Sequence, residues 1–158
     1  MMLGDKNRYK VICHLGDGTF GRALKCQDLQ TNMVVAVKVI RAVKRYTESA
    51  KIEAEVLNDL KKKGGDFNYI VDLKDSFVHR NQGVENVCLV FEPLGKSLFD
   101  FIKANGYRGF EIGQMQSIAY QSLKALEFLH TLKLTHTDLK PENILLKIDE
   151  AIVVTNES

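Results

Sequence analysis

This sequence has little excess of one charge sign, no CxxC cysteine pair and no long apolar run. Each of these absences argues against a class of protein. Its 22 Lys and Arg residues face 20 Asp and Glu residues, so the formal charge of +2 is too small to indicate a nucleic-acid or membrane partner. No apolar run approaches the length of a membrane span, and the N-terminus lacks the apolar core of a signal peptide. We therefore expect no direct contact with nucleic acid and no membrane association.

Cysteine is limited to Cys13, Cys26 and Cys88, with no CxxC pair among them. Each lies in a strand-like stretch, so we expect reduced and mostly buried thiols in place of a disulfide or a zinc site. Free thiols favour a reducing compartment, the cytoplasm or the nucleus. A content of 45% hydrophobic and 27% charged residues is that of a soluble globular protein, and by itself it indicates no chemistry.

Five strand-like segments lie within residues 1–92. The five segments are 9–15, 22–29, 33–40, 70–78 and 87–92. A charged, helix-favouring stretch at 47–62 separates the third segment from the fourth, and Gly64-Gly65 ends it. The polar residues 79–86 are expected to form a loop between the last two strands. The pattern predicts a five-stranded antiparallel sheet with one helix.

The pattern changes from strands to helices at Pro93-Leu94-Gly95. Residues 97–100 have the spacing of a capping box and open a short helix that ends near 105–106. The long helix expected at 111–132 is apolar beyond one stripe, so it should need partners on more than one side. Short strands at 144–146 and 151–154 complete the series. The predicted fold is α+β, with a strand-rich lobe at 1–92, a connector at 93–95 and a mainly helical lobe at 96–158.

A glycine-rich turn joins the first two strands. Residues 16–21 read GDGTFG, in which Gly16, Gly18 and Gly21 match a GxGxxG pattern that also marks dinucleotide-binding folds. A strand follows the turn here, whereas the dinucleotide-binding pattern opens a helix. Such a hairpin can lay its backbone N–H groups over nucleotide phosphates, because glycine has no Cβ to prevent close approach. An ordinary tight hairpin is the alternative.

Lys38 ends a Val-Ala-Val-Lys run in the third strand. A lysine that faces inward from a buried strand is costly unless its charge is paired. Glu53, in the predicted helix, is the expected partner, and Glu55 is a competing carboxylate on a different face of that helix. The pair could hold the lysine ammonium against the α- and β-phosphates of a nucleotide. The alternative is a lysine in solvent on an edge strand.

The most specific signal is the loop HTDLKPEN at residues 136–143. Asp138 can orient a substrate hydroxyl and accept its proton. Lys140 can neutralise charge that develops on a transferred phosphoryl group, and Asn143 can coordinate Mg²⁺. Pro141 fixes its own φ angle and excludes Lys140 from the helical region.

The glycine turn, the Val-Ala-Val-Lys strand, the helix glutamate and the loop at 136–143 occur in the order found in protein kinases. Over residues 9–146 the chain therefore resembles that family. More narrowly, the HTDLKPENIL and LGDGTFGR segments, with Arg45-Tyr46 before the glutamate helix, are similar to the LAMMER-type, or Clk-like, dual-specificity kinases. Two groups of kinases have similar loops and remain alternatives. They are relatives that phosphorylate Ser/Arg-rich splicing factors, and tyrosine-autophosphorylating kinases of the same wider group.

The resemblance implies ATP and Mg²⁺ as cofactors and assigns further residues. Phe91 would be the gatekeeper, and the Glu92 carbonyl and Leu94 N–H would bind the adenine edge on either side of Pro93. The other implied nucleotide-binding residues are Leu15, Gly16, Gly18, Gly21, Ala23, Ala36, Lys38 and Glu53. The expected substrates are protein Ser and Thr residues, with Tyr as a further acceptor and Ser/Arg-rich splicing factors among the proteins. The expected location is the nucleus, the cytoplasm or both.

The sequence departs from the family pattern in three ways. Ala23 stands where valine is usual, and Thr137 stands where arginine is common, although Clk-like kinases also carry threonine there. Neither Asp-Phe-Gly nor Ala-Pro-Glu follows Asn143, so the main metal-binding aspartate is missing from the chain. We expect the N-terminal half of a kinase domain, inactive by itself. The alternative is a non-catalytic ATP-binding or scaffold module, a truncated pseudokinase that ends at Ser158.

Overall fold

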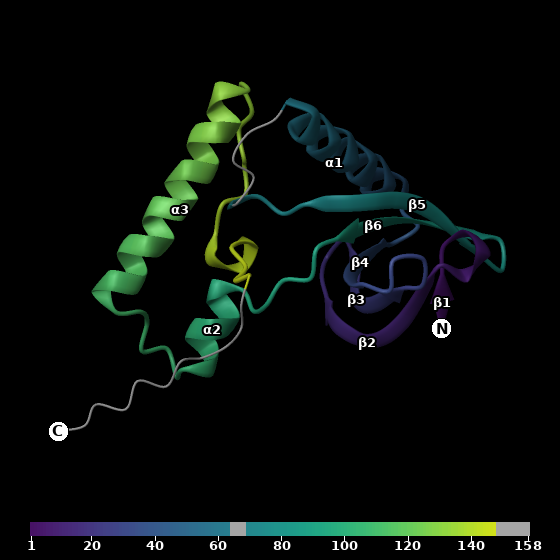
Figure 1. Cartoon of the computed structure of the whole chain (residues 1–158), viewed down its shortest axis with the longest axis horizontal. Helices are drawn as coiled ribbons and strands as arrows, with labels where there is room; N and C mark the ends of the chain where they lie inside the picture. Colours follow the sequence, from purple (N-terminus) through teal and green to yellow (C-terminus); the bar gives the residue numbers. More distant parts are fainter. Residues whose placement is uncertain (64–68, 148–158) are drawn as a thin grey trace. The chain divides into compact units, whose positions relative to one another are not determined.

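The structure, a computed structural model, describes residues 1–63 and 69–147. The chain divides into two compact units, Met1–Pro93 and Leu94–Ser158. The first unit contains a sheet and a helix, and the second is mainly helical (Figure 1). The strand expected at 151–154 and the helix end expected at Gly64-Gly65 lie outside the described residues.

The first unit is built on a six-stranded antiparallel sheet with the strand order β1-β2-β3-β4-β6-β5. Its strands are β1 Met2–Leu3, β2 Tyr9–Asp17, β3 Gly21–Asp28, β4 Val34–Ile40, β5 Leu73–Asn81 and β6 Val84–Phe91. The helix α1 covers Lys44–Lys63, between β4 and β5 in the chain. The five predicted strands and the helix are confirmed. The sixth strand, β1, was not predicted, because two residues are too few to show alternation.

The loop predicted at 79–86 is wrong, because β5 and β6 continue through most of it. Asn81 pairs with Val84, which leaves only Gln82 and Gly83 in the turn. Both turn residues have positive φ angles, 48° and 81°. Positive φ at both central residues matches the twist of a tight antiparallel hairpin. The hairpin is largely exposed here, so its polar composition resembled that of a loop.

Two apolar clusters form the core of the first unit, and β6 contributes to both. Cys88 and Val90 belong to one cluster, while Val87 and Leu89 belong to the other. Successive side chains of a strand point to opposite faces, so the two clusters lie on the two faces of the sheet. The second cluster includes Ala50 and Ala54 of α1, which therefore packs on that face.

Two of the three cysteines are buried and one is exposed. Cys26 and Cys88 are buried, and burial raises the pKa of their thiols to about 11 and about 12. Cys13 is exposed, contrary to the expectation that strand-like surroundings would bury it.

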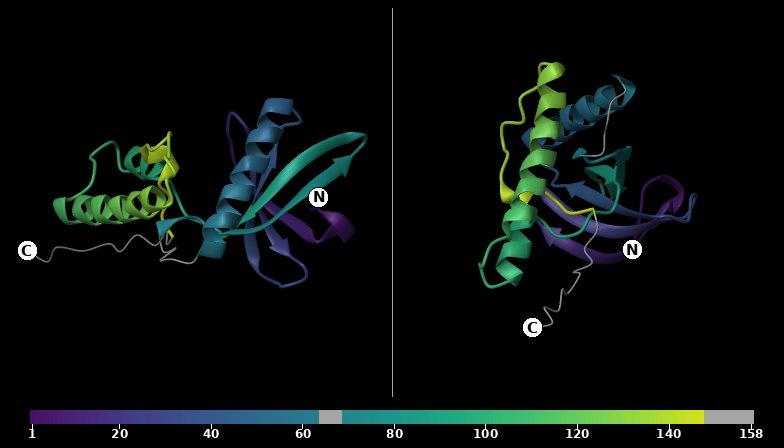
Figure 2. Two further views of the ribbon diagram at one scale, coloured as in Figure 1. Left: turned by 90° about the horizontal axis from the view of Figure 1, so that it is seen from above. Right: turned by 60° about the vertical axis from the view of Figure 1, so that its left-hand side comes forward.

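The second unit contains α2 Leu98–Ala104, α3 Ile112–Thr131 and the short helix η3 Pro141–Asn143 (Figure 2). Ser97 caps α2 as predicted, since its hydroxyl accepts the Asp100 N–H at 3.0 Å and donates to the Asp100 carboxylate at 2.7 Å. No residue of α3 is buried by the described part of the chain. No helix in that part is long and apolar enough to cross a membrane.

Candidate active site

The glycine turn lies between β2 and β3, and its three glycines differ in what surrounds them. A Cβ atom at Gly21 would lie 2.2 Å from the Val39 carbonyl oxygen, so the neighbouring strand requires glycine there. A Cβ at Gly16 would meet nothing within 4 Å, and one at Gly18 would meet only a backbone oxygen at 3.8 Å. Neither residue has a positive φ angle. Open space over residues 16 and 18 suits the close approach of a ligand to the backbone.

The predicted ion pair between Lys38 and Glu53 is present. The Lys38 ammonium donates to both carboxylate oxygens of Glu53, at 3.2 Å and 3.0 Å. The two side chains are 34% and 40% exposed, so solvent reaches the pair. Lys38 is paired with Ala23 across the β3–β4 ladder, and Ala36 lies two residues before it on the same face. The two small residues and the paired lysine therefore share one face of the sheet.

Phe91 and Glu92 lie near the end of the first unit, beside the start of β5. Phe91 pairs with Ala36 of β4 and with Leu73 of β5. The Glu92 backbone N–H donates to the Asp72 carbonyl at 3.1 Å, and the Asp72 N–H donates to a Glu92 carboxylate oxygen at 3.0 Å. This double link holds residue 92 in place through both its backbone and its side chain.

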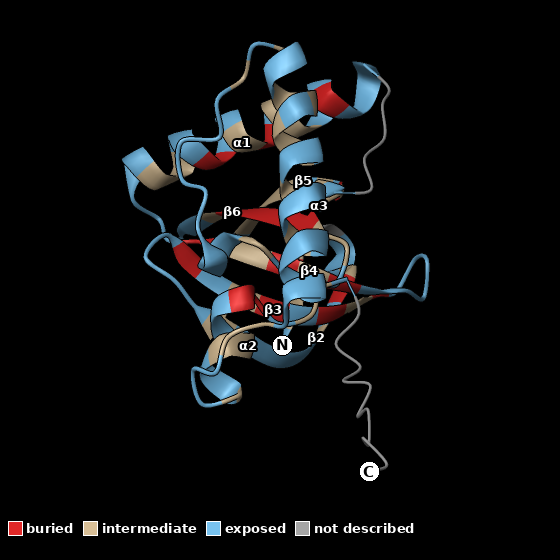
Figure 3. Ribbon diagram, turned by 90° about the vertical axis from the view of Figure 1, so that its left-hand side faces the viewer, coloured by how far each residue is buried: buried red, intermediate tan, exposed pale blue. Residues whose placement is uncertain are grey.

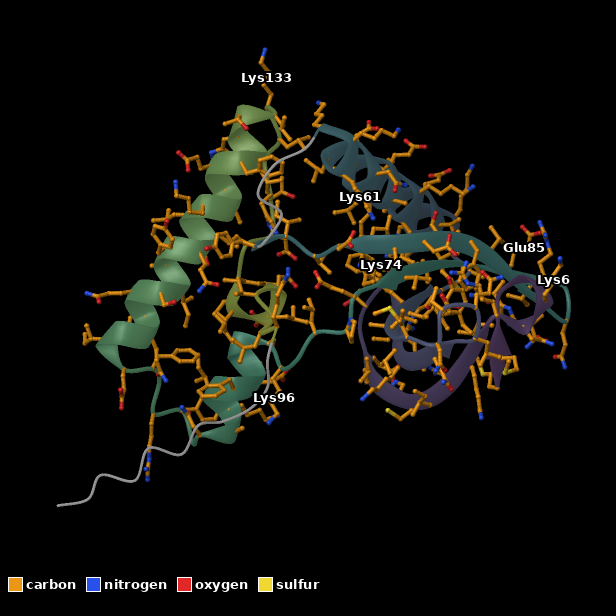
Figure 4. All side chains as sticks on the ribbon, in the orientation of Figure 1. Lys6, Lys61, Lys74, Glu85, Lys96 and Lys133 are labelled. Carbon is orange, nitrogen blue, oxygen red and sulfur yellow. The ribbon has the colours of Figure 1, made fainter. Side chains whose placement is uncertain are left out.

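Asp72 is in turn attached to α1, a connection that the sequence did not predict. Lys61 of α1 and Lys74 of β5, both labelled in Figure 4, hydrogen-bond its carboxylate. Burial alone would raise the pKa of Asp72, but the two ammonium groups outweigh it and hold that pKa below the ordinary value. The C-terminal end of α1 is thus linked to the segment that we predicted to bind adenine.

The loop of residues 136–143 arranges its predicted groups around one carboxylate. The Lys140 ammonium lies 3.0 Å from one oxygen of Asp138, and the Asn143 amide donates to the other at 2.9 Å. These two hydrogen bonds, that from Lys140 first, hold the pKa of Asp138 below its ordinary value. At neutral pH Asp138 is therefore an ionised acceptor, as a residue that receives a hydroxyl proton must be.

The backbone of this loop is held by two further hydrogen bonds. Asn143 also donates to the Asp138 carbonyl at 2.8 Å, and the His136 ring accepts the Asp138 N–H at 3.2 Å. Lys140 has φ −161° and ψ 163°, the extended conformation expected before Pro141. Thr137 has a φ of 64°, which is rare for a β-branched residue. The sequence carries no signal for this last feature.

The segment after the loop attaches it to α2. The short strand predicted at 144–146 appears as a bridge between Leu145 and Ser97. The Gly95 and Leu98 N–H groups donate to the carbonyls of Leu146 and Ile144, at 2.7 Å and 2.9 Å. Of the remaining predicted adenine-binding residues, Leu15 is exposed at the end of β2, and Leu94 is half-buried at the start of the second unit.

The described residues do not by themselves form a magnesium site. Mg²⁺ prefers oxygen ligands, and Asn143 can offer its amide oxygen because its amide nitrogen is engaged by Asp138. Yet residues 1–63 and 69–147 contain no group of three or more His, Cys, Asp or Glu side chains that could hold a metal ion. The donor set agrees with Mg²⁺ in kind and is too small in number.

A lysine held by a helix glutamate, and a carboxylate held by lysine and asparagine on a loop, are two arrangements that protein kinases combine. The chain belongs to the protein kinase family, since residues 9–155 match the protein kinase domain. It is 48% identical over 141 residues to serine/threonine-protein kinase AFC2 of Arabidopsis thaliana. It is 43% identical over 142 residues to dual specificity protein kinase CLK2 of Homo sapiens. These relatives confirm the resemblance to LAMMER-type kinases.

A solved structure agrees with the sequence relatives. The crystal structure of a kinase domain, 45% identical in sequence, superposes with a TM-score of 0.84 over 94% of this chain and 42% of its own. The predicted α+β kinase fold is thereby confirmed. The match to AFC2 covers 88% of this chain but only 32% of AFC2. The match to CLK2 covers 28% of CLK2. The match covers the N-terminal part of a catalytic domain, in a family that generally uses ATP and Mg²⁺ and acts on proteins.

Proposed function

We propose that the complete protein transfers the γ-phosphoryl group of ATP to Ser and Thr residues of proteins, with Tyr as a further acceptor. In this proposal the chain supplies the nucleotide-binding sheet and the loop that receives the substrate hydroxyl. The observation that carries it is the Asp138 carboxylate, held by Lys140 at 3.0 Å and by Asn143 at 2.9 Å. That arrangement leaves a charged acceptor on an exposed loop with its orientation fixed.

In the first unit, each group would act on a different part of ATP. The phosphates would approach the backbone of the turn at Gly16 and Gly18, where no side chain interferes. Lys38, held by Glu53, would neutralise the α- and β-phosphates. The adenine would be enclosed by apolar residues and recognised through backbone groups on either side of Pro93. The residues proposed for adenine are Leu15, Ala23, Ala36, Phe91, Glu92 and Leu94.

In the second unit, proton transfer and charge neutralisation would be separated. Asp138 would orient the substrate hydroxyl and accept its proton as the new phosphate ester bond forms. Lys140 would stabilise the negative charge on the transferred group. Asn143 would contribute one oxygen to Mg²⁺, which supplies charge neutralisation on the phosphates when bound.

The names of the relatives support Ser/Thr acceptors, and the dual-specificity names support Tyr as well. We extend the proposal to Ser/Arg-rich splicing factors as substrates and to action in the nucleus, the cytoplasm or both. Both extensions rest on the similarity to Clk-like kinases. Phosphorylation of Ser/Arg-rich and acidic control peptides by the complete gene product would test the first extension.

The decisive experiment is to sequence the native transcript beyond the codon for Ser158 and to purify the complete protein that it encodes. Wild-type protein should phosphorylate a protein substrate in the presence of Mg²⁺. Asp138→Asn should lower turnover by about 10² to 10⁴-fold and leave ATP affinity within about twofold. Lys38→Met should instead weaken ATP binding as well as turnover. Full activity of Asp138→Asn would contradict the role given to that carboxylate.

A non-catalytic nucleotide-binding or scaffold module is the second candidate. It is favoured by the absence, among residues 1–63 and 69–147, of a group of three or more side chains that could hold a metal ion. This candidate expects ATP binding that hardly depends on Mg²⁺, and no phosphoryl transfer by the complete product. Mg²⁺-dependent transfer would exclude it.

A further inference from the structure

Phe20 is the only large apolar side chain of the glycine turn at residues 16–21. The turn has one internal backbone hydrogen bond, from the Gly18 N–H to the Gly21 carbonyl at 2.8 Å. Because Gly16 and Gly18 have open space around them, packing over the turn cannot come from those positions. The 51% exposed Phe20 is therefore the side chain through which the turn can be held from outside.

Phe20 contacts Tyr46, in the first turn of α1. The two rings meet edge to face, with centroids 5.2 Å apart and planes at 84°. This is a favourable aromatic geometry, since the positive edge of one ring faces the negative face of the other. Tyr46 also packs on the core cluster that includes Ile40 and Ala50. The turn is thus connected to the core through one aromatic side chain.

Arg45 and Arg41 complete the attachment. The Arg45 guanidinium lies 4.7 Å from the centre of the Tyr46 ring and donates to its hydroxyl at 2.8 Å, which restricts the ring. The Arg41 N–H donates to the Phe20 carbonyl at 3.0 Å, and the Arg41 side chain reaches the Gly18 carbonyl at 3.4 Å. Arg41, directly after β4, therefore holds the backbone of the turn, and Tyr46 of α1 holds the Phe20 side chain.

Tyr46 lies seven residues before Glu53 on the same helix. Seven residues are close to two turns, so the two side chains project from the same face of α1. Glu53 holds Lys38, and Tyr46 holds Phe20. A movement of α1 would therefore displace the lysine partner and the glycine turn together.

We propose that Tyr46 is a positioning residue that couples the glycine turn to the helix carrying Glu53, so that the turn and the lysine are placed on the nucleotide as one unit. The nucleotide part of this inference rests on the proposed function, whereas the coupling itself is a property of the free chain. The competing interpretation is that Tyr46 only fills space in the core beside α1.

Leu57 provides a matched control for that interpretation. It also lies on α1 and also packs, partly buried, on the same core cluster. A space-filling role predicts that Leu57→Ala and Tyr46→Ala have similar effects on the turn. Tyr46→Phe keeps the ring and loses only the hydroxyl, so it should retain the wild-type amide exchange of the turn.

The first measurement is residue-resolved amide hydrogen exchange by NMR on the whole 158-residue chain. The reporters are the N–H groups of Gly18 and Arg41, normalised to the buried strand residue Cys26. Tyr46→Ala and Phe20→Ala should each accelerate exchange at both reporters by about threefold to tenfold, the loss expected for one aromatic pair. The double variant should add little to either single change, because the two residues act through one contact.

The outcomes separate cleanly. Tyr46→Phe and Leu57→Ala should leave normalised exchange at the reporters within about twofold of the wild type. Equal acceleration by Leu57→Ala, or no acceleration by Tyr46→Ala, would overturn the coupling. The second measurement is the affinity for a fluorescent ATP analogue, which Tyr46→Ala should weaken by about threefold to tenfold and Tyr46→Phe should preserve.

The second measurement also distinguishes this inference from the proposed function. If the wild-type chain binds no nucleotide, the proposed ATP site fails, while the exchange data still decide whether Tyr46 holds the turn. If the wild type binds and Tyr46→Ala binds equally well despite faster exchange, the positioning role is overturned and the ATP site stands.

Discussion

The two units each contain a helix of 20 residues, and the two helices differ in a way that their compositions do not suggest. Helix α1 is rich in charge, yet it buries Ala50, Ala54 and Leu60. Helix α3 is the more apolar of the two, yet the described residues bury none of its side chains (Figure 3). Apolar periodicity thus predicts that a helix forms, whereas burial depends on what the rest of the fold places against it.

The largest expected difference between the units is in local stability. In the 158-residue chain, amides of α3 should exchange at least about 10³-fold faster than those of β6, because core strands open only with the whole unit. Hydrogen exchange followed by mass spectrometry or NMR measures both elements in one sample. Strongly protected α3 amides, with a single sharp unfolding transition, would show that this helix is covered and stable in the chain.

Leucine truncation should sharpen the same comparison. Leu89 of β6 is fully buried, whereas Leu123 of α3 is 65% exposed. Leu89→Ala should lower the free energy of unfolding of the first unit by about 2–5 kcal/mol, the range for a buried leucine. Leu123→Ala should change stability by less than about 0.5 kcal/mol. Urea denaturation monitors both, and equal losses would contradict the assignment of burial.

Glycine-to-alanine changes should have opposite signs in the two units. Gly21→Ala places a Cβ 2.2 Å from the Val39 carbonyl oxygen, so it should destabilise the first unit by about 1–3 kcal/mol. Gly113→Ala in α3 meets nothing within 4 Å and should be neutral or stabilise the helix by up to about 1 kcal/mol. Thermal unfolding of both variants tests the signs, and a stabilised Gly21→Ala protein would refute the clash.

Acid sensitivity should also be concentrated in the first unit. The Arg8 guanidinium, 2.7 Å from the buried Asp28 carboxylate, lowers the pKa of Asp28 to about 2. Because the folded pKa lies below the unfolded one, this carboxyl stabilises the fold above about pH 4, and its contribution is lost as the pH falls toward 2. The contribution should be about 2 kcal/mol at neutral pH.

The measurement is the free energy of unfolding from pH 2 to pH 6 for the wild type and Asp28→Asn. The wild-type stability should fall with acid in this window, and the variant should be less stable at neutral pH with a flatter profile. The matched control is Glu127→Gln in α3, where the Lys124–Glu127 pair is exposed and solvent weakens it. A control profile as altered as that of Asp28→Asn would show that the buried pair has no special weight.

The sequence predicted the features that depend on local pattern and motif spacing. The five long strands follow from alternation, and the Lys38–Glu53 pair was predicted from a lysine in a strand and a glutamate in the helix that follows it. The loop at 136–143 was recognisable because its chemistry is contiguous in the chain. The extended Lys140 followed from the proline after it.

The features that it missed depend on residues brought together by folding. The link from Lys61 through Asp72 to Glu92 joins three segments with no shared motif. The contact of Phe20 with Tyr46 needs both the turn and α1 in place. Cys13 is exposed although Tyr9 and Val11 pack on the core, because the β2–β3 ladder shifts register between Val11 and Cys13, which alternation alone does not reveal.

Because Cys26 and Cys88 are buried and Cys13 is exposed, thiol labelling can report when the first unit unfolds. A thiol reacts as its thiolate, and burial both shields Cys26 and Cys88 and raises their pKa values to about 11 and about 12. An alkylating reagent should therefore modify one thiol, Cys13, while the sheet is closed. Modification of the other two would mark the opening of the sheet, so labelling rates can time that event without any introduced probe.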